Sequence, residues 1–444
     1  MRTAFARPLA ALLLATSLAL APAAARGQPP ATPAVAPTAA QPVEAPPGSE
    51  LEVYVMTMGQ GDLLWERFGH NALGIRDTRT GTDLVFNWGM FSFEQPGFLP
   101  RFLRGEMRYW MAPFDATQML LAYQQDNRSV TVQRLNLSAA QKDSLRRFVI
   151  WNSQDEHKFY RYDYYRDNCS TRVRDAIDMI TGGAIKRATD TVVTPMTYRD
   201  HSLRLMDGMF WTRTGIDLAL GRPTDRPITA WEAMFIPMEF QRRLRDIRVP
   251  DSTGRLVPLV ASEQELFTAS RTPELMSVPS LALGGLALGV VVAVVCYLVG
   301  FRLPGRAGAM TLSLAWASVA GVLGLLLFLL WTVTQHVASH ANQNLFFINP
   351  LWLAVALLLP FAGAARRWRE WLLLLVRTTA LLSIVGAIVA LTPWGQPSRA
   401  IAAFAAPVNL AMYFLVLRVV YLAQQRANRD AEHLARLSHS APRR

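Results

Sequence analysis

The sequence Tyr-Arg-Asp-Asn-Cys-Ser-Thr-Arg, residues 165–172, marks the point at which a loop is predicted to become a helix. Asn168 is a favoured N-cap residue for a helix predicted over Ser170–Ile180, which two glycines end. Cys169 therefore falls at the first helical turn, where unpaired backbone N–H groups and the helix dipole favour a thiolate. The same N–H groups can receive an oxyanion. Arg172 adds positive charge nearby.

Cys169 is the single cysteine outside the strongly apolar part of the chain, because Cys296 lies in a segment predicted to cross lipid. A lone thiol in an exported domain has no intramolecular disulfide partner, so it is a spare residue, an intermolecular bridge or a nucleophile. A small buried residue on a helix is the structural alternative. Position alone does not decide between that role and catalysis.

The chain is predicted to be exported. Residues 1–25 combine a basic start, a short apolar stretch and small residues before a cut expected after Ala25, which is typical of a secretory signal peptide. Residues 26–49 are rich in Ala and Pro and predict an extended linker. Residues 50–272 are long enough for one domain with its own core.

Residues 276–424 are predicted to form a bundle of five transmembrane helices. Arginines cluster in alternate connections and in the basic tail, residues 425–444, so the positive-inside rule places the tail in the cytoplasm and residues 50–272 outside it. The net charge of +12 owes much to these arginines, and no nucleic-acid partner is expected. Four blocks are long enough to cross a bilayer and the third is marginal. The blocks are Val278–Val299, Met310–Trp331, Leu351–Ala365, Trp371–Leu391 and Ile401–Leu422.

The exported domain has the mixed pattern of an α+β fold. Strands are predicted at Leu51–Met58, Ala72–Arg76 and Asp83–Trp88, and the alternation over Ser129–Leu137 predicts a fourth. A capping box that starts at Ser138 predicts a helix.

A thiol nucleophile needs a base within hydrogen-bond reach, and the domain offers His70, His157 and His201. His70 is placed at a strand start, whereas the other two read as surface positions. Spacing alone does not choose among them. Asn87 on the following strand is the candidate to orient the His70 imidazole, with Asp163 and Asp167 as rivals.

Glu66–Ile75 and Asp163–Asp175 resemble the N-terminal periplasmic domain of Lnb-type bacterial lipoprotein N-acyltransferases, a relative of the circularly permuted NlpC/P60 papain-like folds. In those folds a histidine on an early strand precedes a cysteine at a later helix N-terminus, and His70 and Cys169 have this order. Further agreement lies in Phe86–Phe93, Phe102–Gly105, Gly215–Gly221, Gln335–His336, Asn342–Leu345 and Asn349–Leu351.

The resemblance implies a permuted papain-like (NlpC/P60-type) extracytoplasmic domain followed by an α-helical bundle of five transmembrane helices. It implies a cysteine-dependent N-acyltransferase with Cys169 as nucleophile and His70 as base, and no cofactor. The implied donor is a phospholipid, and the implied acceptor is the N-terminal amine of a lipidated lipoprotein. The implied location is the inner membrane, with the catalytic domain in the periplasm.

Five further residues are candidates for positioning lipid or acceptor: Asn168, Asp163, Arg172, His336 and His340. The two histidines share a face if their loop is helical, but no carboxylate or cysteine lies nearby to complete a metal site, and no metal is expected.

The aromatic segment Phe86–Phe114 predicts domain core, a groove for acyl chains or a face that lies on the lipid headgroups. Arg101, Arg104 and Arg108 are interleaved with these aromatic residues. Two other function classes stay open. One is a membrane-tethered cysteine peptidase or amidase acting on cell wall, and the other is a non-catalytic sensor or scaffold.

Overall fold

The computed structural model describes residues 45–302 and 306–440. The predicted signal peptide and almost all of the predicted linker lie outside the described residues, as do the last four residues of the predicted tail.

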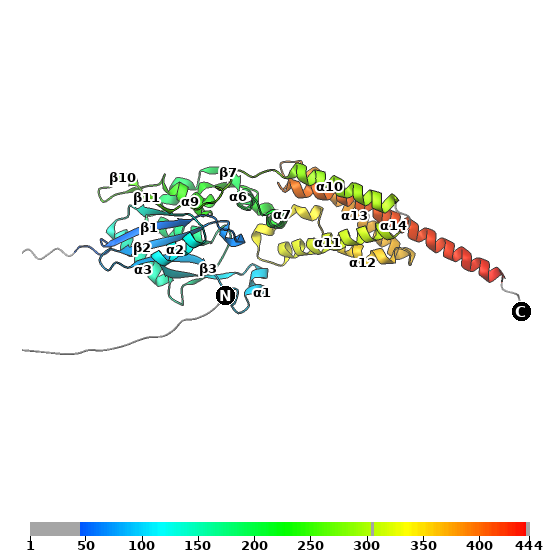
Figure 1. Cartoon of the computed structure of the whole chain (residues 1–444), viewed down its shortest axis with the longest axis horizontal. Coiled ribbons are helices and arrows are strands. Elements are labelled where there is room, and N and C mark those ends of the chain that lie inside the picture. The colour runs from blue at the N-terminus through cyan, green and yellow to red at the C-terminus, as the bar shows by residue number, and fades with distance from the viewer. Residues whose placement is uncertain (1–44, 303–305, 441–444) are drawn as a thin grey trace, which may run out of the picture. The chain divides into compact units, whose positions relative to one another are not determined.

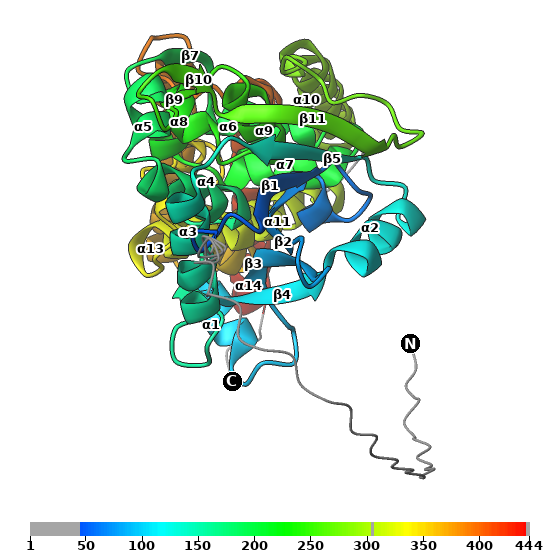
Figure 2. The ribbon, with the colours of Figure 1, turned by 90° about the vertical axis from the view of Figure 1, so that its left-hand side faces the viewer.

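A seven-stranded antiparallel sheet forms the framework of the N-terminal domain (Figures 1 and 2). The strand order is β11-β5-β1-β2-β3-β4-β6. The predicted strands are present, and those containing residues 72–76 and 83–88 each run one or two residues further. The strands of this sheet are β1 (Leu51–Met58), β2 (His70–Asp77), β3 (Asp83–Met90), β4 (Arg108–Asp115), β5 (Val130–Leu135), β6 (Phe159–Arg161) and β11 (Val260–Phe267).

Helices and two small two-stranded sheets complete the domain. In the described part of the chain, its α-helices are α1 (Phe98–Arg104), α2 (Ala116–Gln125), α3 (Ala139–Asn152), α4 (Cys169–Ile180), α5 (Ala184–Thr189), α6 (Tyr198–Leu205), α7 (Phe210–Ala219), α8 (Ala230–Ala233) and α9 (Pro237–Leu244). The small sheets pair β7 (Val193–Thr197) with β8 (Pro227–Thr229), and β9 (Arg248–Pro250) with β10 (Leu256–Pro258).

Alternate residues of the central strand β1 reach opposite faces of the sheet, as the two-residue period of a strand requires. Val53 and Val55 join the larger core, to which α3 and α4 contribute. Tyr54 and Met56 join a smaller core with Met119 of α2. The sheet therefore has helices on both faces (Figure 2), and this sandwich fixes the start of α4 against the sheet.

The start of α4 is defined by the predicted cap. The side-chain oxygen of Asn168 accepts the backbone N–H groups of Ser170 and Thr171 at 2.9 and 3.0 Å. Val173 and Ile177 pack into the larger core one turn apart. Cys169 is therefore the first residue of the helix, one position earlier than predicted.

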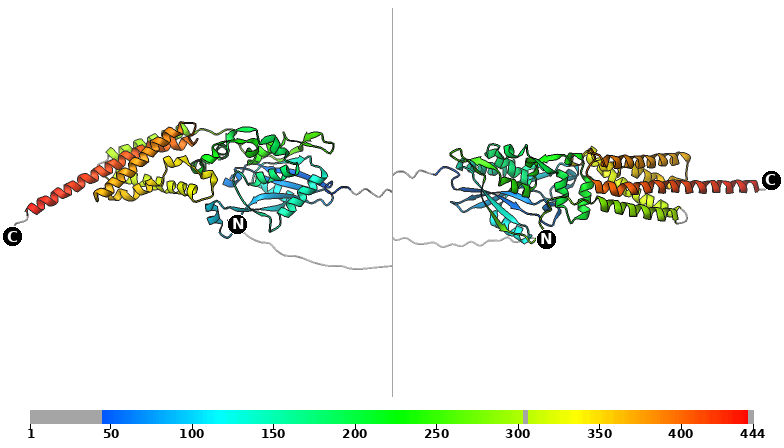
Figure 3. Two further views of the ribbon diagram at one scale, coloured as in Figure 1. Left: turned by 180° about the vertical axis from the view of Figure 1, so that it is seen from behind. Right: turned by 90° about the horizontal axis from the view of Figure 1, so that it is seen from above.

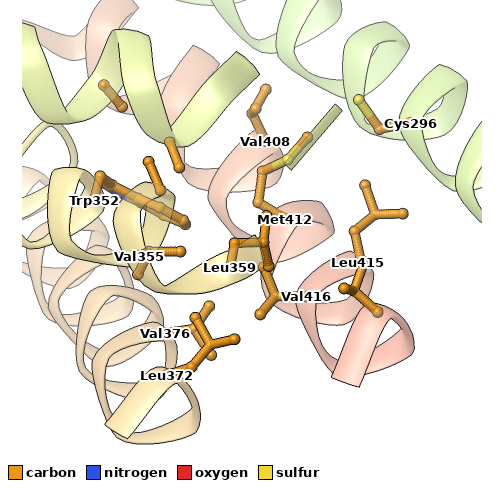
Figure 4. Close-up of a cluster of buried hydrophobic side chains, with 14 of the residues drawn as sticks. Cys296, Trp352, Val355, Leu359, Leu372, Val376, Val408, Met412, Leu415 and Val416 are labelled. Atoms are coloured by element: carbon orange, nitrogen blue, oxygen red, sulfur yellow. The ribbon is translucent and has the colours of Figure 1, made fainter. Parts of the chain in front are cut away.

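Five helical segments in the described part of the chain are long and apolar enough to cross a membrane. They pack side by side (Figures 1 and 3), around buried residues such as Trp352, Val355 and Met412 (Figure 4). The third is built from an eight-residue α-helix flanked by 3-10 turns, which explains its marginal apolar length. The α-helices are α10 (Ala282–Tyr297), α11 (Ala307–Thr332), α12 (Leu351–Leu358), α13 (Arg366–Ala390) and α14 (Arg399–Ser440).

Hydrogen bonds join the loop between α11 and α12 to the N-terminal domain. The Asn342 side-chain amide donates to the carbonyls of Leu218 and Ala219 at 2.8 and 3.1 Å. Asn344 donates to the carbonyl of Leu218 at 3.0 Å. Leu218 and Ala219 are the last two residues of α7, where backbone carbonyls lack a partner within the helix. Asn342 and Asn344 therefore cap the C-terminus of α7 from a distant segment of the chain.

Candidate functional site

The start of α4 lies beside the start of β2, and the backbone N–H of Asn71, the residue after His70, approaches the Cys169 sulfur. The Asn71 side-chain amide donates to the Ser170 hydroxyl at 2.9 Å, and that hydroxyl donates to the Met234 carbonyl at 2.7 Å. Asn71 and Ser170 are both buried. A hydrogen bond between the neighbours of His70 and of Cys169 therefore anchors the helix start to the strand start.

Strand β3 approaches Cys169 through a glycine. Gly89 has a φ of +93°, a conformation that side chains rarely adopt. A Cβ atom added at Gly89 would lie 3.4 Å from the Cβ atom of Cys169. The glycine therefore serves both the backbone conformation and the close approach of β3 to α4.

The imidazole of His70 is oriented by Asn87. The Nε2 atom of His70 lies 2.9 Å from the side-chain oxygen of Asn87. The Asn87 amide nitrogen donates to the Val85 carbonyl at 3.1 Å, which fixes the oxygen on the histidine side. Because that oxygen can only accept, a neutral His70 carries its proton on Nε2, and Nδ1 keeps a free lone pair.

Among the described residues, the hydrogen bond to Asn87 is the only one that the His70 ring makes. No hydrogen bond joins the thiol to the imidazole within this part of the chain. The rival orienters are engaged elsewhere, since Asp167 pairs with Arg172 and Asp163 accepts the N–H groups of Tyr165 and Arg166.

Desolvation by the surrounding protein favours the neutral forms of His70 and Cys169, although both side chains are partly exposed. It lowers the pKa of His70 to about 4, against a smaller opposing effect of the Asn87 hydrogen bond. It also raises the pKa of the Cys169 thiol, although the backbone N–H groups of Asn71, Ser170 and Cys169 itself oppose the rise. The helix start therefore does not produce a resting thiolate, contrary to the prediction, because desolvation outweighs the N–H groups.

The positive charge that acts on the thiol comes from Arg128, not from the predicted Arg172. Arg128 is 5% exposed, and its charge lowers the pKa of both Cys169 and His70. Its guanidinium lies 3.7 Å from the Glu66 carboxylate and donates to the Gly59 carbonyl at 3.0 Å. Arg172 instead pairs with Asp167. The sequence carries no signal for Arg128, because only the folded sheet brings this residue, two positions before β5, near the thiol.

Two tyrosines, one on β6 and one just after it, lie near Cys169. Burial, and next the proximity of Cys169, raises the pKa of Tyr160 and of Tyr162 well above the usual range. The Tyr160 hydroxyl is buried and makes no hydrogen bond to any of the described residues. Tyr162 stacks on Tyr109 with ring centroids 4.3 Å apart. Tyr109 belongs to the aromatic segment Phe86–Phe114, and no sequence pattern connects that segment to Cys169.

The other predicted positioning residues have different tasks. Asn168 is 5% exposed; it caps α4 with its oxygen and donates to the Tyr164 and Phe235 carbonyls, so it keeps no free group for substrate. Arg172 lies over the ring of Tyr160, 4.2 Å from its centroid. Asp163 closes the turn before α4.

His336 and His340 do not share a helical face. A short 3-10 turn separates them, and His340 bonds the Thr334 carbonyl at 3.2 Å. The Nε2 atom of His336 lies 2.9 Å from the Phe102 carbonyl, and its ring stacks on Tyr164. No group of three metal-binding side chains occurs in the described ranges.

The two histidines set aside in favour of His70 differ from each other. His157 stacks on Trp151, with centroids 4.2 Å apart. His201 was predicted at the surface, and this is wrong, because it is 2% exposed. Its Nδ1 accepts from Arg204 at 3.2 Å, inside a group of charged side chains that includes Glu239 and Glu274.

Comparison with protein families connects this geometry to known proteins. Residues 44–203 match the Lnb N-terminal periplasmic domain, and residues 283–429 match the Lnb transmembrane domain. His70, Asn87 and Cys169 all lie in the first match. No curated protein and no solved structure matches the chain. The matches and the five apolar helices describe a membrane protein with a periplasmic α+β domain, and the chain belongs to the Lnb family.

Proposed function

We propose that the protein is a membrane-bound thiol acyltransferase. It moves an acyl chain from a phospholipid, through a thioester on Cys169, to the N-terminal amine of a lipidated bacterial lipoprotein. One observation carries the proposal: Asn87 occupies Nε2 of His70 and leaves the Nδ1 lone pair open, beside the helix start that presents Cys169. A thiol with a base and backbone N–H groups suits acyl transfer.

In the first half-reaction the sulfur of Cys169 bonds to the carbonyl carbon of a phospholipid ester while Nδ1 of His70 accepts the thiol proton. The backbone N–H groups of Asn71 and Cys169 stabilise the negative charge that develops beside the sulfur. The ester C–O bond then breaks. His70 gives its proton to the departing oxygen, so lysophospholipid leaves and a thioester remains.

In the second half-reaction the amine of the acceptor attacks the thioester carbonyl. His70 accepts a proton from the amine nitrogen, the C–S bond breaks, and the proton returns to the sulfur of Cys169. The products are an amide and the original thiol–imidazole pair. Water must be kept from the thioester, because hydrolysis would release a free fatty acid.

A lipid donor is supported by the surroundings of the thiol. Tyr162 and Tyr109 form an aromatic wall there, whereas a cell-wall peptidase would need an open polar cleft. The five apolar segments hold the domain at a bilayer, where acyl chains have a high effective concentration. We place the protein in the inner membrane with residues 50–272 as the periplasmic catalytic domain.

The test is the intact mass of the full-length protein after incubation with phosphatidylethanolamine vesicles. We expect an adduct of one acyl chain that hydroxylamine removes. The Cys169→Ser variant should show no hydroxylamine-sensitive adduct, and membranes containing it should not acylate a lipoprotein acceptor. A Cys296→Ser variant is the matched control and should behave as the wild type.

Three outcomes contradict the proposal. Wild-type acylation of the acceptor by Cys169→Ser would remove the nucleophile. Digestion of muropeptides by the protein, without any acyl adduct, would favour the peptidase. A Cys169 that reacts with neither lipid nor maleimide in the native protein would point to a sensor or scaffold.

A further inference from the structure

We propose that a cavity beside α1 binds the acyl chain of the donor phospholipid and leads it to Cys169. The inference rests on the proposed function, because the acyl chain that it places is the one transferred. Four features carry it: the lining of the cavity, an aromatic path to the thiol, the attachment of α1 to the membrane-spanning part, and an unpaired arginine.

The cavity is apolar and of suitable size. It is open to the surface, has a volume of about 500 Å³ and is lined mainly by Phe93, Phe98, Leu99, Pro100 and Phe102. Cavities that bind small organic ligands have volumes of roughly 300–1,000 Å³ and are mostly apolar. Phe93 and Leu99 are 65% and 63% exposed, which is costly in water unless something covers them.

A continuous series of ring contacts connects the cavity to the thiol. Phe98 stacks on Phe91 at 6.2 Å between centroids, and Phe91 stacks on Tyr109 at 5.1 Å. Tyr109 stacks on Tyr162 at 4.3 Å, and Tyr162 adjoins Cys169. An acyl chain in the cavity therefore has an apolar surface along the route by which its ester reaches the sulfur.

Helix α1 is attached to the part of the chain that crosses the membrane. The backbone N–H of Gln335 donates to the Arg104 carbonyl at 2.8 Å, and Nε2 of His336 lies 2.9 Å from the Phe102 carbonyl. Both residues follow within four positions of Thr332, the last residue of α11. The cavity therefore lies near a membrane boundary, where acyl chains are available.

A cation is available for the headgroup. The Arg104 side chain on α1 is exposed and has no side-chain partner among the residues that the structure describes. Arg101, by contrast, donates to the Pro96 carbonyl and to Gln95, and so shapes the loop before the helix. An exposed guanidinium on the helix that lines the cavity complements a lipid whose phosphate adjoins its chains.

The test compares two acyl donors. Thioester formation on Cys169 is measured by intact mass, with phosphatidylethanolamine vesicles or with p-nitrophenyl acetate, whose two-carbon acyl group does not need the cavity. Phe93→Ser and Leu99→Ser should lower the ratio of the vesicle rate to the acetate rate by about tenfold or more, since each removes apolar contact with the chain. Leu256→Ser, an equally exposed leucine on β10, is the control and should keep the wild-type ratio.

A second measurement separates this inference from the proposed function. Vesicles containing a phospholipid with a photoreactive diazirine in its acyl chain are irradiated with the full-length Cys169→Ser variant, and cross-linked peptides are mapped. We expect cross-links within residues 91–104. Cross-links there without a thioester in the wild type would overturn the acyltransferase and retain the lipid site. If the wild type forms the thioester but Phe93→Ser and Leu99→Ser keep the wild-type ratio of vesicle rate to acetate rate, only the acyl-chain site in the cavity is overturned. Cross-links outside residues 91–104 would have the same consequence.

Discussion

The Nε2 atom of His70 lies 2.9 Å from the Asn87 side-chain oxygen, and this hydrogen bond decides which ring nitrogen is free to act as a base. The two residues come from adjacent strands, β2 and β3, whose register pairs Leu73 with Phe86. If the register is continued, Gly89 lies opposite His70. Asn87 is two positions from Gly89 and therefore on the same face of the sheet as His70. The arrangement is built from strand geometry and needs no flexible loop.

Replacing Asn87 should reduce acylation without unfolding the protein. In Asn87→Ala the imidazole loses the partner that fixes its tautomer, and we expect thioester formation to slow by about 10- to 100-fold. In Asn87→Asp a carboxylate beside the ring should raise the pKa of His70 and move the acidic limb of the pH profile upward. Asn136→Ala, at an exposed position outside the site, is the control. If the acidic limb of the pH profile of Asn87→Asp stays where it is in the wild type, the role of Asn87 in orienting His70 is contradicted.

The pH dependence of acylation should report the desolvated environment of the His70 ring. Its pKa is lowered to about 4, so the neutral base persists well below pH 6.5 and activity should fall only as the pH drops through about 4. The same shift contributes stability that is fully present above pH 6.5 and is lost as the pH falls from 6.5 towards 4. The measurement is the rate of Cys169 acylation by p-nitrophenyl acetate against pH. A midpoint near 6.5 would show a solvated histidine.

Removing the charge of Arg128 should shift two pKa values in the same direction. That charge lowers the pKa of Cys169 and of His70, so Arg128→Gln should raise both. Alkylation of the thiol by iodoacetamide should then need a higher pH, and the acidic limb of acylation should move upward. Arg128→Lys keeps the charge and should stay closer to the wild type. Arg134→Gln is the control for a general loss of positive charge, because Arg134 is exposed and forms an ion pair with Glu52.

Gly89 should be sensitive for two separable reasons. An alanine there costs about 1–2 kcal/mol in backbone strain, and its Cβ also meets the Cβ of Cys169 at 3.4 Å. Gly254 has a φ of +81° with open space around it, so Gly254→Ala carries the strain alone. Both variants should lose thermal stability, whereas only Gly89→Ala should slow acylation, by up to about 100-fold if the sulfur is displaced by an ångström. Equal acylation rates would contradict a tight approach of β3.

The sequence by itself determined the local elements. Two-residue alternation predicted β5, the cap at Asn168 predicted the start of α4, and long apolar runs predicted the membrane-crossing helices. These features depend on neighbouring residues in the chain, so periodicity and capping chemistry are sufficient to find them. The order of His70 and Cys169 was visible at the same level.

Only the tertiary structure decided the environment of the dyad. The partnership of Asn71 with Ser170, the arrival of Arg128 near the thiol and the burial of His201 all join residues distant in sequence. The prediction that Cys169 favours the thiolate is contradicted for the same reason. The effect of a helix N-terminus on the thiol depends on neighbouring residues in the chain, whereas desolvation depends on all the groups packed around the sulfur. Proximity and dielectric environment are properties of the folded chain, and no short stretch of sequence specifies them.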